Sequence, residues 1–284
     1  MKMNLKTRLA QQELLMAAGV FDALSALLVE EAGFEAAFVS GSAVAYSQLA
    51  RPDIGLVTLT EMAFALERIR DRVDMYLLVD ADSGFGNAFD VQRTVRTFER
   101  AGANGIQIED QLNTKSPKQV AARPVLSTDA MVGKIKAAVD ARQKSETVIS
   151  ARSDAVFTLG VEQGLMRAQA FIEAGADMVF VEGIKDPADI QKLTKICGEN
   201  APVLYNLINP SLFTPEQLQS FGVSMALYPA VMINSMANSG REAATNLSQK
   251  LGLFKGNKPI PEPINNIIGS DKFLQNGYRY DEHS

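Results

Sequence analysis

Two carboxylates stand two residues apart in the stretch LLVDADSGFGN, which covers Leu77–Asn87. Asp80 and Asp82 follow an apolar run that is typical of a buried strand, and residues i and i+2 of a strand point to the same side. Two such charges repel each other unless a cation lies between them. Oxygen ligands suit Mg²⁺ or Mn²⁺, so the stretch predicts a divalent cation site, with Glu109 as a third acid. The alternative is a set of buried ion pairs in which Arg152 or a lysine supplies the positive charge.

The single cysteine and the single histidine limit the chemistry further. Cys197 lies in the helix-like stretch KLTKICGEN and is interpreted as a core residue, whereas His283 lies next to the C-terminal residue. These counts argue against a disulfide framework, Ser-His-Asp or Cys-His catalysis, and zinc or iron held by histidine. Carboxylates, arginines, lysines, hydroxyls and backbone groups are left to perform the function.

Composition points to a small-molecule ligand. The chain has 284 residues, 46% of them hydrophobic, and a formal net charge of -5. It has no basic run interleaved with aromatic residues, so we expect no nucleic-acid partner. It also has no apolar run of 18 residues and no secretory signal at its start, so we expect no membrane insertion and a cytoplasmic location.

One pattern recurs along the chain, a helix that ends in glycine and is followed by a short apolar strand. It is found at Glu31–Gly41, Arg100–Asp110, Glu173–Gly183 and, more loosely, Ser220–Pro229. The glycines fit the left-handed position that ends many helices. Amphipathic helical patterns and further strand candidates lie between these joints, giving eight strands and about eight helices.

Strands that alternate with helices indicate parallel βαβ units, and eight of them suit a closed (β/α)₈ barrel. A doubly wound sheet is the alternative, but the first strand runs into AAGVFDALSA without a G-x-G-x-x-G turn. Composition changes only near FKGNKPIPEPINN. We therefore expect a barrel over residues 1–253 and an extended C-terminal arm over 254–284.

Polar residues follow the predicted strands where each strand ends, which is the face of this fold that carries chemistry. They are Ser40, Gly41, Asp80, Asp82, Glu109, Arg152, Glu182, Asn206 and Tyr228. Ser40, Glu109 and Glu182 each lie seven residues after a helix-ending glycine. Agreement across so many strands predicts a single site at this face.

The same residues resemble a known family. The stretches VDADSGFGN, IEDQ followed by Lys115, SARSD, RPDIG and EAGADMVFVEG are similar to those of the isocitrate lyase and phosphoenolpyruvate mutase superfamily, over about Leu15 to Leu247. The resemblance implies a (β/α)₈ barrel that assembles as a homotetramer, a dimer of dimers with swapped terminal helices. It also implies that Mg²⁺ presents a 2-oxo or 2-hydroxy carboxylate and stabilises an enolate-like species.

The resemblance implies roles for individual residues. Asp82 would be the direct metal ligand, with Asp80 and Glu109 around it. Ser40, Gly41 and Ser42 would bind the substrate carboxylate, and Glu182 and Asn206 would form a polar wall. The catalytic candidates are Arg152, which would pair with substrate oxygens, Asp53 of RPDIG near the reacting centre, and Lys115 on a loop over the strand ends.

The chain departs from the family at that loop. Superfamily lyases that cleave isocitrate-like substrates carry K-[KR]-C-G-H there, with the cysteine as proton donor. Here the segment Lys115–Gln119 reads KSPKQ, with Pro117 in the cysteine position. The phosphonate mutases have an asparagine at the position of Pro117, and methylisocitrate lyases have an arginine at the position of Asn234. Neither specialised activity therefore fits all of its expected residues.

Three functions stay open on the sequence. The first is a Mg²⁺-dependent carbon–carbon lyase or decarboxylase acting on a small 2-oxo or 2-hydroxy dicarboxylate, such as oxaloacetate or a substituted malate. The second is a phosphonate C–P bond mutase or hydrolase, or a carboxyvinyl-carboxyphosphonate mutase-like enzyme, of the same superfamily. The third is a non-catalytic protein that binds metal and carboxylate.

Overall fold

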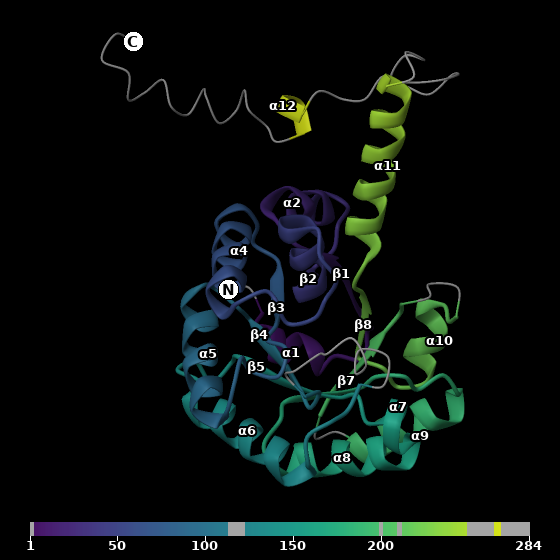
Figure 1. The fold of residues 1–284 in the computed structure, drawn as a ribbon. Coiled ribbons are helices and arrows are strands. Elements are labelled where there is room, and N and C mark those ends of the chain that lie inside the picture. The colour runs from purple at the N-terminus through teal and green to yellow at the C-terminus, as the bar shows by residue number, and fades with distance from the viewer. Residues whose placement is uncertain (1–2, 113–122, 199–200, 209–211, 249–263, 268–284) are drawn as a thin grey trace. The chain divides into compact units, whose positions relative to one another are not determined.

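Eight parallel strands close into a barrel in chain order (Figure 1). The computed structural model describes residues 3–112, 123–198, 201–208, 212–248 and 264–267. The strands are β1 (Leu15–Val20), β2 (Ala36–Val39), β3 (Tyr76–Asp80), β4 (Gly105–Glu109), β5 (Val148–Ser153), β6 (Met178–Val181), β7 (Val203–Asn206) and β8 (Met225–Tyr228). The last strand pairs with the first, from Leu15 opposite Met225 to Ala18 opposite Tyr228. The predicted (β/α)₈ barrel is confirmed.

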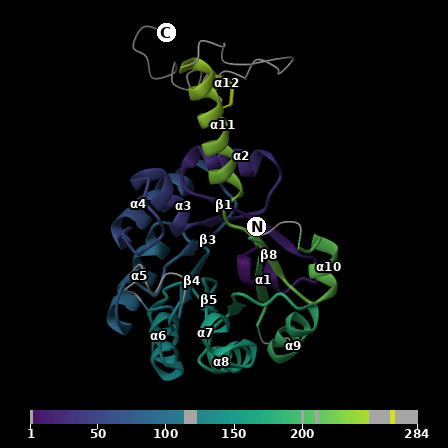
Figure 2. The same ribbon diagram turned by 45° about the vertical axis from the view of Figure 1, so that its right-hand side comes forward.

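Helices cover the outside of the strands, and α4 to α9 can be followed around the barrel in both views (Figures 1 and 2). The barrel helices are α2 (Ala23–Glu31), α4 (Leu59–Arg72), α5 (Ala88–Arg100), α6 (Thr128–Ala141), α8 (Val161–Glu173), α9 (Pro187–Cys197) and α10 (Pro215–Ser220). Shorter or terminal elements are α1 (Leu5–Leu9), α3 (Gly41–Val44), the π-helix η1 (Ala45–Leu49), α7 (Val156–Leu159), α11 (Val231–Ser248) and α12 (Ile264–Ile267).

Local signals in the sequence set where these helices begin and end. Asn87 caps α5 by accepting a hydrogen bond from the Phe89 amide at 2.8 Å, and the Asp90 side chain accepts from the Asn87 amide at 2.8 Å. The glycines that follow α5 and α8 have positive φ, 97° at Gly102 and 99° at Gly175, as the recurring joint predicts. Each joint returns the chain to the barrel at the amino end of the next strand.

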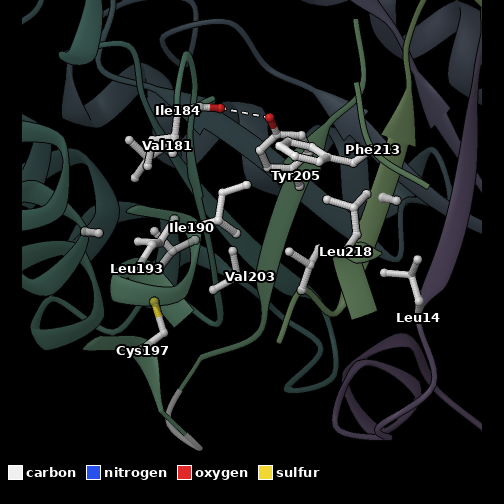
Figure 3. Close-up of a cluster of buried hydrophobic side chains, with 14 of the residues drawn as sticks. Leu14, Val181, Ile184, Ile190, Leu193, Cys197, Val203, Tyr205, Phe213 and Leu218 are labelled. Atoms are coloured by element: carbon white, nitrogen blue, oxygen red, sulfur yellow. Dashed lines mark hydrogen bonds between the residues drawn. The ribbon is translucent and has the colours of Figure 1, made fainter. Parts of the chain in front are cut away.

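The barrel interior and the layer beneath the helices form separate cores. The interior core contains inward side chains from the strands together with Leu5 and Leu9 of α1, so this helix closes the amino-terminal end of the barrel. A second core lies under α8, α9 and α10 and includes Cys197 (Figure 3). The cysteine is buried, and burial raises its pKa to about 12, which fits the predicted core role.

The chain divides into two compact units, Met1–Ile233 and Asn234–Ser284. The first contains the whole barrel, and α11 begins at its last residues and continues into the second. Of the expected C-terminal arm, the structure describes only α12. None of the helices in the described part of the chain is both long and apolar enough to span a membrane.

Candidate active site

A small cavity lies where β3, β4 and β5 end. Its volume is about 80 Å³, and it is lined by Asp53, Asp80, Asp82, Glu109, Gln111, Arg123 and Arg152. Four carboxylates therefore share one small space with two guanidinium groups. The structure brings the three predicted metal-site acids together with Asp53 and Arg152, although they come from separate segments of the chain.

The two acids of the DxD pair reach this cavity through a turn. Strand β3 ends at Asp80, and Asp82 has a left-handed backbone with φ of 45°. Strand alternation therefore does not continue to Asp82, contrary to the expectation from i, i+2 spacing. Instead, the Asp82 amide donates to Asp80 Oδ1 at 3.1 Å, and the Glu109 amide donates to the Asp82 carbonyl at 2.8 Å. The three acids are thus linked by hydrogen bonds through backbone amides.

Side chains from two outer helices hold the turn that follows. Lys134 Nζ on α6 donates to the Ser83 carbonyl at 2.7 Å, and Thr94 Oγ1 on α5 donates to the Gly84 carbonyl at 3.2 Å. Lys134 is buried, and burial lowers its pKa. The sequence does not single out this lysine, because it lies in an ordinary amphipathic helix about fifty residues after Ser83. The one signal in the sequence is that Lys134 lies on the apolar face of this helix, where a lysine needs a hydrogen-bond partner.

Arg152 lies among carboxylates from three strands. Its Nη1 is 3.5 Å from Glu109 Oε2, and its Nη2 is 3.0 Å from Asp154 Oδ1 and 3.5 Å from Glu182 Oε2. Burial lowers the pKa of the guanidinium, but the charges of these three carboxylates outweigh burial and hold the pKa well above its usual value. Arg152 is therefore a permanent, rigidly held cation at the edge of the acid cluster.

Asp154 is the partner of both arginines in the cavity. Its Oδ1 accepts from Arg152 Nη2 at 3.0 Å and from Arg123 Nη1 at 2.9 Å, and its side chain is fully buried. Burial raises the pKa of this carboxyl, but the two guanidinium charges outweigh burial and leave the pKa below its usual value. Asp154 lies in the SARSD motif two residues after Arg152, but the motif alone does not predict that its carboxylate pairs with both arginines.

Asp110 of the IEDQ motif ties β4 to β5 beneath the cavity. Its carboxylate accepts from Ser153 Oγ at 2.7 Å, from the Asp154 amide at 2.9 Å and from Arg167 Nη1 at 2.8 Å. Burial raises the pKa of Asp110 even though these partners favour its charged form. Asp110 therefore supports Asp154, the carboxylate that pairs with both Arg152 and Arg123.

Glu182 and Asn206 form a pair at the ends of β6 and β7. Asn206 Nδ2 donates to Glu182 Oε2 at 2.9 Å, and the Gly183 amide donates to Glu182 Oε1 at 3.1 Å. Six buried side-chain polar atoms of the described residues have no hydrogen-bond partner, and three of them, Asn206 Oδ1, Arg152 Nε and Asp154 Oδ2, belong to this site. Buried polar atoms of this kind are normally satisfied by protein, water or ligand.

The predicted carboxylate-binding segment lies beside the acids. The Gly41 amide donates to Asp80 Oδ2 at 3.3 Å, while Ser40 Oγ accepts from the Ala43 amide at 3.2 Å and lies 3.0 Å from Ser42 Oγ. Neither serine is among the described residues that line the cavity. The Ser40 hydroxyl serves here as the cap of α3. Lys115 lies outside the described residues.

The donor set fits a hard cation that keeps much of its water. Among the residues that the structure describes, no three acidic, histidine or cysteine side chains are arranged to coordinate one metal ion together. Mg²⁺ usually takes one or two carboxylates directly and retains several waters. The cavity is lined by four carboxylates, those of Asp53, Asp80, Asp82 and Glu109. Their oxygen atoms suit an ion that binds one or two carboxylates directly and keeps several waters.

A closed parallel barrel that gathers acids and arginines in one cavity at its strand ends defines a (β/α)₈ barrel enzyme. The chain belongs to the phosphoenolpyruvate phosphomutase family, whose model matches residues 5–248. The resemblance inferred from the sequence motifs is confirmed.

Named relatives include carbon–carbon lyases. The chain is 37% identical to 2-methylisocitrate lyase of Salmonella typhimurium, with 95% of this chain and 92% of the relative aligned. It is 36% identical to 2,3-dimethylmalate lyase of Eubacterium barkeri, with 81% of this chain and 80% of the relative aligned. The prediction of a lyase of this superfamily is confirmed.

Solved structures agree with this assignment. A crystal structure of 2,3-dimethylmalate lyase superposes with a TM-score of 0.88 at 27% identity, covering 98% of this chain and 97% of that one. Oxaloacetate acetylhydrolase bound to 3,3-difluorooxalacetate gives 0.87 at 27% identity and 96% coverage of both chains. Phosphonopyruvate hydrolase with oxalate and Mg²⁺ gives 0.87 at 27% identity and 97% coverage of both chains. The family therefore holds several reactions on one barrel.

Proposed function

We propose that the protein is a Mg²⁺-dependent lyase or decarboxylase that breaks a carbon–carbon bond in a small 2-oxo or 2-hydroxy dicarboxylate, such as oxaloacetate or a substituted malate. The observation that carries the proposal is the cavity in which Asp80, Asp82 and Glu109 face Arg152. Acids that suit a hard cation lie there beside a fixed guanidinium. A cation held by these acids and the Arg152 guanidinium would together bind a ligand that carries a carboxylate next to a second oxygen atom.

In this proposal Asp82 would hold the ion directly, and Asp80 and Glu109 would hold its waters. When bound, Mg²⁺ supplies Lewis-acid chemistry and orients the substrate. Mn²⁺, which prefers similar oxygen ligands, is the natural replacement. The amide hydrogen bonds from Asp82 to Asp80 and from Glu109 to the Asp82 carbonyl hold the three acids in place.

The residues around the acids then handle charge and protons. With a 2-hydroxy substrate, a base removes the hydroxyl proton, a carbonyl forms at C2, the C2–C3 bond breaks, and its electron pair passes to C3. C3 takes a proton from water, and the base returns the hydroxyl proton to solvent. With a 2-oxo diacid, the C3–C4 bond breaks, carbon dioxide leaves, and the electron pair passes towards the C2 oxygen. We assign donation to that oxygen to Arg152, because it is a rigid, permanently charged donor.

Asp53 is our candidate for the base, because it lines the same cavity. Lys115, which lies outside the described residues, is our candidate for a cation that meets the anionic substrate. Ser40, Gly41 and Ser42 are assigned to the substrate carboxylate, and Glu182 and Asn206 to the wall beside Arg152. We further propose a homotetramer, built as a dimer of dimers, that works in the cytoplasm.

Two measurements test the function. Oxaloacetate and substituted malates are screened with Mg²⁺, and pyruvate is incubated with enzyme and Mg²⁺ in deuterated water. We expect turnover of at least one diacid and metal-dependent deuterium exchange at C3 of pyruvate. Phosphate release from phosphonopyruvate without diacid turnover would indicate C–P chemistry instead. A protein that binds these acids with neither turnover nor exchange would be a binding protein.

Methylisocitrate and isocitrate are a separate test, because Pro117 replaces the loop cysteine and Asn234 replaces the arginine that the resemblance assigns to the additional carboxylate of these substrates. A positioned general acid contributes about 10²- to 10⁴-fold to a rate, and proline has no proton to give. We therefore expect cleavage of both tricarboxylates to be very slow. Turnover on the order of 10 per second, the usual scale for enzymes, would contradict this and require another proton donor.

A further inference from the structure

Two polar residues lie inside the barrel directly beneath the acid cavity. Gln107 of β4 and Ser150 of β5 are opposite each other in the parallel pairing of these strands. Both are buried, with exposed fractions of 1% and 0%. Along their strands they come two residues before Glu109 and Arg152, which line the cavity. The two residues therefore form part of the floor on which the proposed reaction site is built.

Strand alternation places both side chains in the barrel interior. The residues two positions earlier on the two strands, Gly105 and Val148, face the interior core. Val148 is a member of that core, and a Cβ atom added to Gly105 would lie 2.9 Å from Leu78 Cδ1 of the same core. Residues two apart on a strand point to the same side. Gln107 and Ser150 therefore point inward.

Each of the two side chains has an oxygen atom without a protein partner. In the part of the chain that the structure describes, Gln107 Oε1 and Ser150 Oγ are buried and accept or donate no hydrogen bond. The same holds for Arg152 Nε, on the next inward position of β5 after Ser150. Most of the buried polar atoms of a folded protein have a partner, so three such atoms on two neighbouring strands indicate a bound polar molecule.

The chemistry of the three atoms matches a water molecule. Arg152 Nε only donates, Gln107 Oε1 only accepts, and Ser150 Oγ can do either. A buried water typically makes about three hydrogen bonds to polar groups that the protein leaves without partners. The Arg152 guanidinium lies 5.1 Å from the ring of Phe180, a member of the interior core, and so leans over the barrel interior. Its Nε is therefore on the side from which such a water would be reached.

We propose that an ordered water lies inside the barrel between Gln107 and Ser150, and that these two side chains act through it as positioning residues for Arg152. The water accepts a hydrogen bond from Arg152 Nε and donates one to Gln107 Oε1, with Ser150 Oγ as its third partner. The guanidinium is thus held from beneath by the water and at its outer edge by three carboxylates. The water site rests on the geometry alone, whereas the positioning role rests on the proposed function.

A crystal structure of the native protein that resolves ordered waters tests the site directly. We expect a water within about 3.2 Å of Gln107 Oε1, Ser150 Oγ and Arg152 Nε. A direct hydrogen bond between the Gln107 and Ser150 side chains would overturn the proposal. An interior without an ordered water at this place would overturn it as well.

Unfolding measurements test the site in solution. If a water satisfies both oxygen atoms, Ser150→Ala and Gln107→Met each remove a hydrogen bond and should each raise the unfolding equilibrium constant about fivefold. The double variant should cost less than the product of the two single effects, because apolar groups then replace both partners of the water. If the oxygen atoms are unsatisfied in the folded protein, each single change should instead stabilise it, which would overturn the water site.

Kinetics with a diacid that the enzyme turns over test the positioning role. Ser150→Ala and Gln107→Met should lower kcat about 10- to 100-fold with little change in KM, because the guanidinium keeps its charge but loses its support. Met178→Leu is the matched control, because Met178 is opposite Ser150 on β6 and carries no hydrogen-bonding group that holds the water. It should retain full kcat.

The outcomes separate the water site from the reaction. Full kcat in both polar variants would overturn the positioning role, and so would an equal loss of kcat in Met178→Leu, which would indicate disturbed packing. Without turnover of any diacid by the native protein, the proposed function fails and the positioning role fails with it. The crystal structure and the unfolding measurements decide the water site in either case.

Discussion

At the scale of single residues, the site depends on charges that compensate each other within one small space. Asp80, Asp82 and Glu109 supply negative charge, and Arg152 lies at their edge with Asp154 and Glu182 as further partners. Removing one member leaves the charge of another uncompensated in a buried place, which is costly. Single substitutions here should therefore have large and distinguishable effects.

Arg152→Lys tests whether the guanidinium acts on the reacting oxygen. Lysine keeps the charge but loses the planar fork, so we expect kcat to fall on the order of 10²- to 10³-fold, as when one oxyanion donor is removed. KM should change much less. Arg142→Lys, at the opposite end of β5 where Arg142 Nη1 donates to the Thr147 carbonyl, is the control and should retain full kcat. A raised KM with unchanged kcat would limit Arg152 to ground-state binding.

Asp82 is the residue on which metal binding should depend most. Asp82→Ala is expected to abolish Mg²⁺ binding in calorimetry, whereas Asp80→Asn should only weaken it. Asp82→Asn is a useful second variant, because asparagine tolerates the left-handed backbone and so removes the charge with little strain. Glu146→Ala, an exposed carboxylate at the far end of the barrel, should bind Mg²⁺ as the native protein does. Unchanged affinity in both Asp82 variants would refute the assignment.

At the scale of elements, outer helices position the turn that carries Asp82. Lys134 of α6 holds the Ser83 carbonyl from outside the barrel. Lys134→Met fills similar space without the hydrogen bond, so the turn should loosen and Mg²⁺ affinity should fall about 10- to 100-fold, as for other residues that orient a metal ligand. Lys136→Met, an exposed lysine on the same helix, should have no effect. Equal affinities in the two variants would show that the turn is rigid on its own.

The elements were predictable from sequence to a greater degree than the contacts between them. Glycine-ended helices and short apolar strands follow local rules, so the barrel could be predicted, and with it the face on which Glu109 and Glu182 lie. The positive φ of Asp82 depends on support from β4 and the outer helices, which spacing does not encode. Asp154 and Lys134 were missed for the same reason, because their partners are set by packing between distant segments.

At the scale of the whole molecule, stability should depend on pH through Asp154. Its pKa lies below the usual 3.8 in the folded state, so its carboxylate contributes full stability above pH 3.8 and loses this contribution as the pH falls through the lower folded value. Asp154→Asn should therefore lower the free energy of unfolding at neutral pH by about 3–5 kcal/mol. The difference from the native protein should shrink below pH 3.8.

Denaturant titrations at neutral pH and below pH 3.8 measure this dependence. Asp110 acts in the opposite direction. Its pKa is raised in the folded state, so the free energy of unfolding falls as the pH rises from 3.8 to the raised pKa of Asp110. Asp189→Asn, a half-buried carboxylate near the start of α9 that pairs with the exposed Lys192, is the control and should change stability little at either pH. A difference for Asp154→Asn that stays the same at both pH values would contradict the carboxylate role.

The helix that closes the amino end of the barrel also determines the order in which the protein can be completed. Leu5 and Leu9 are made before every strand of the barrel, yet they belong to the core that includes Met225 and Leu227 of β8. During synthesis these two leucines must wait for more than two hundred further residues before that core exists. A growing chain that stops before β8 therefore leaves Leu5 and Leu9 of α1 without part of their core, and incompletely buried apolar side chains of this kind make a partly folded chain prone to aggregation.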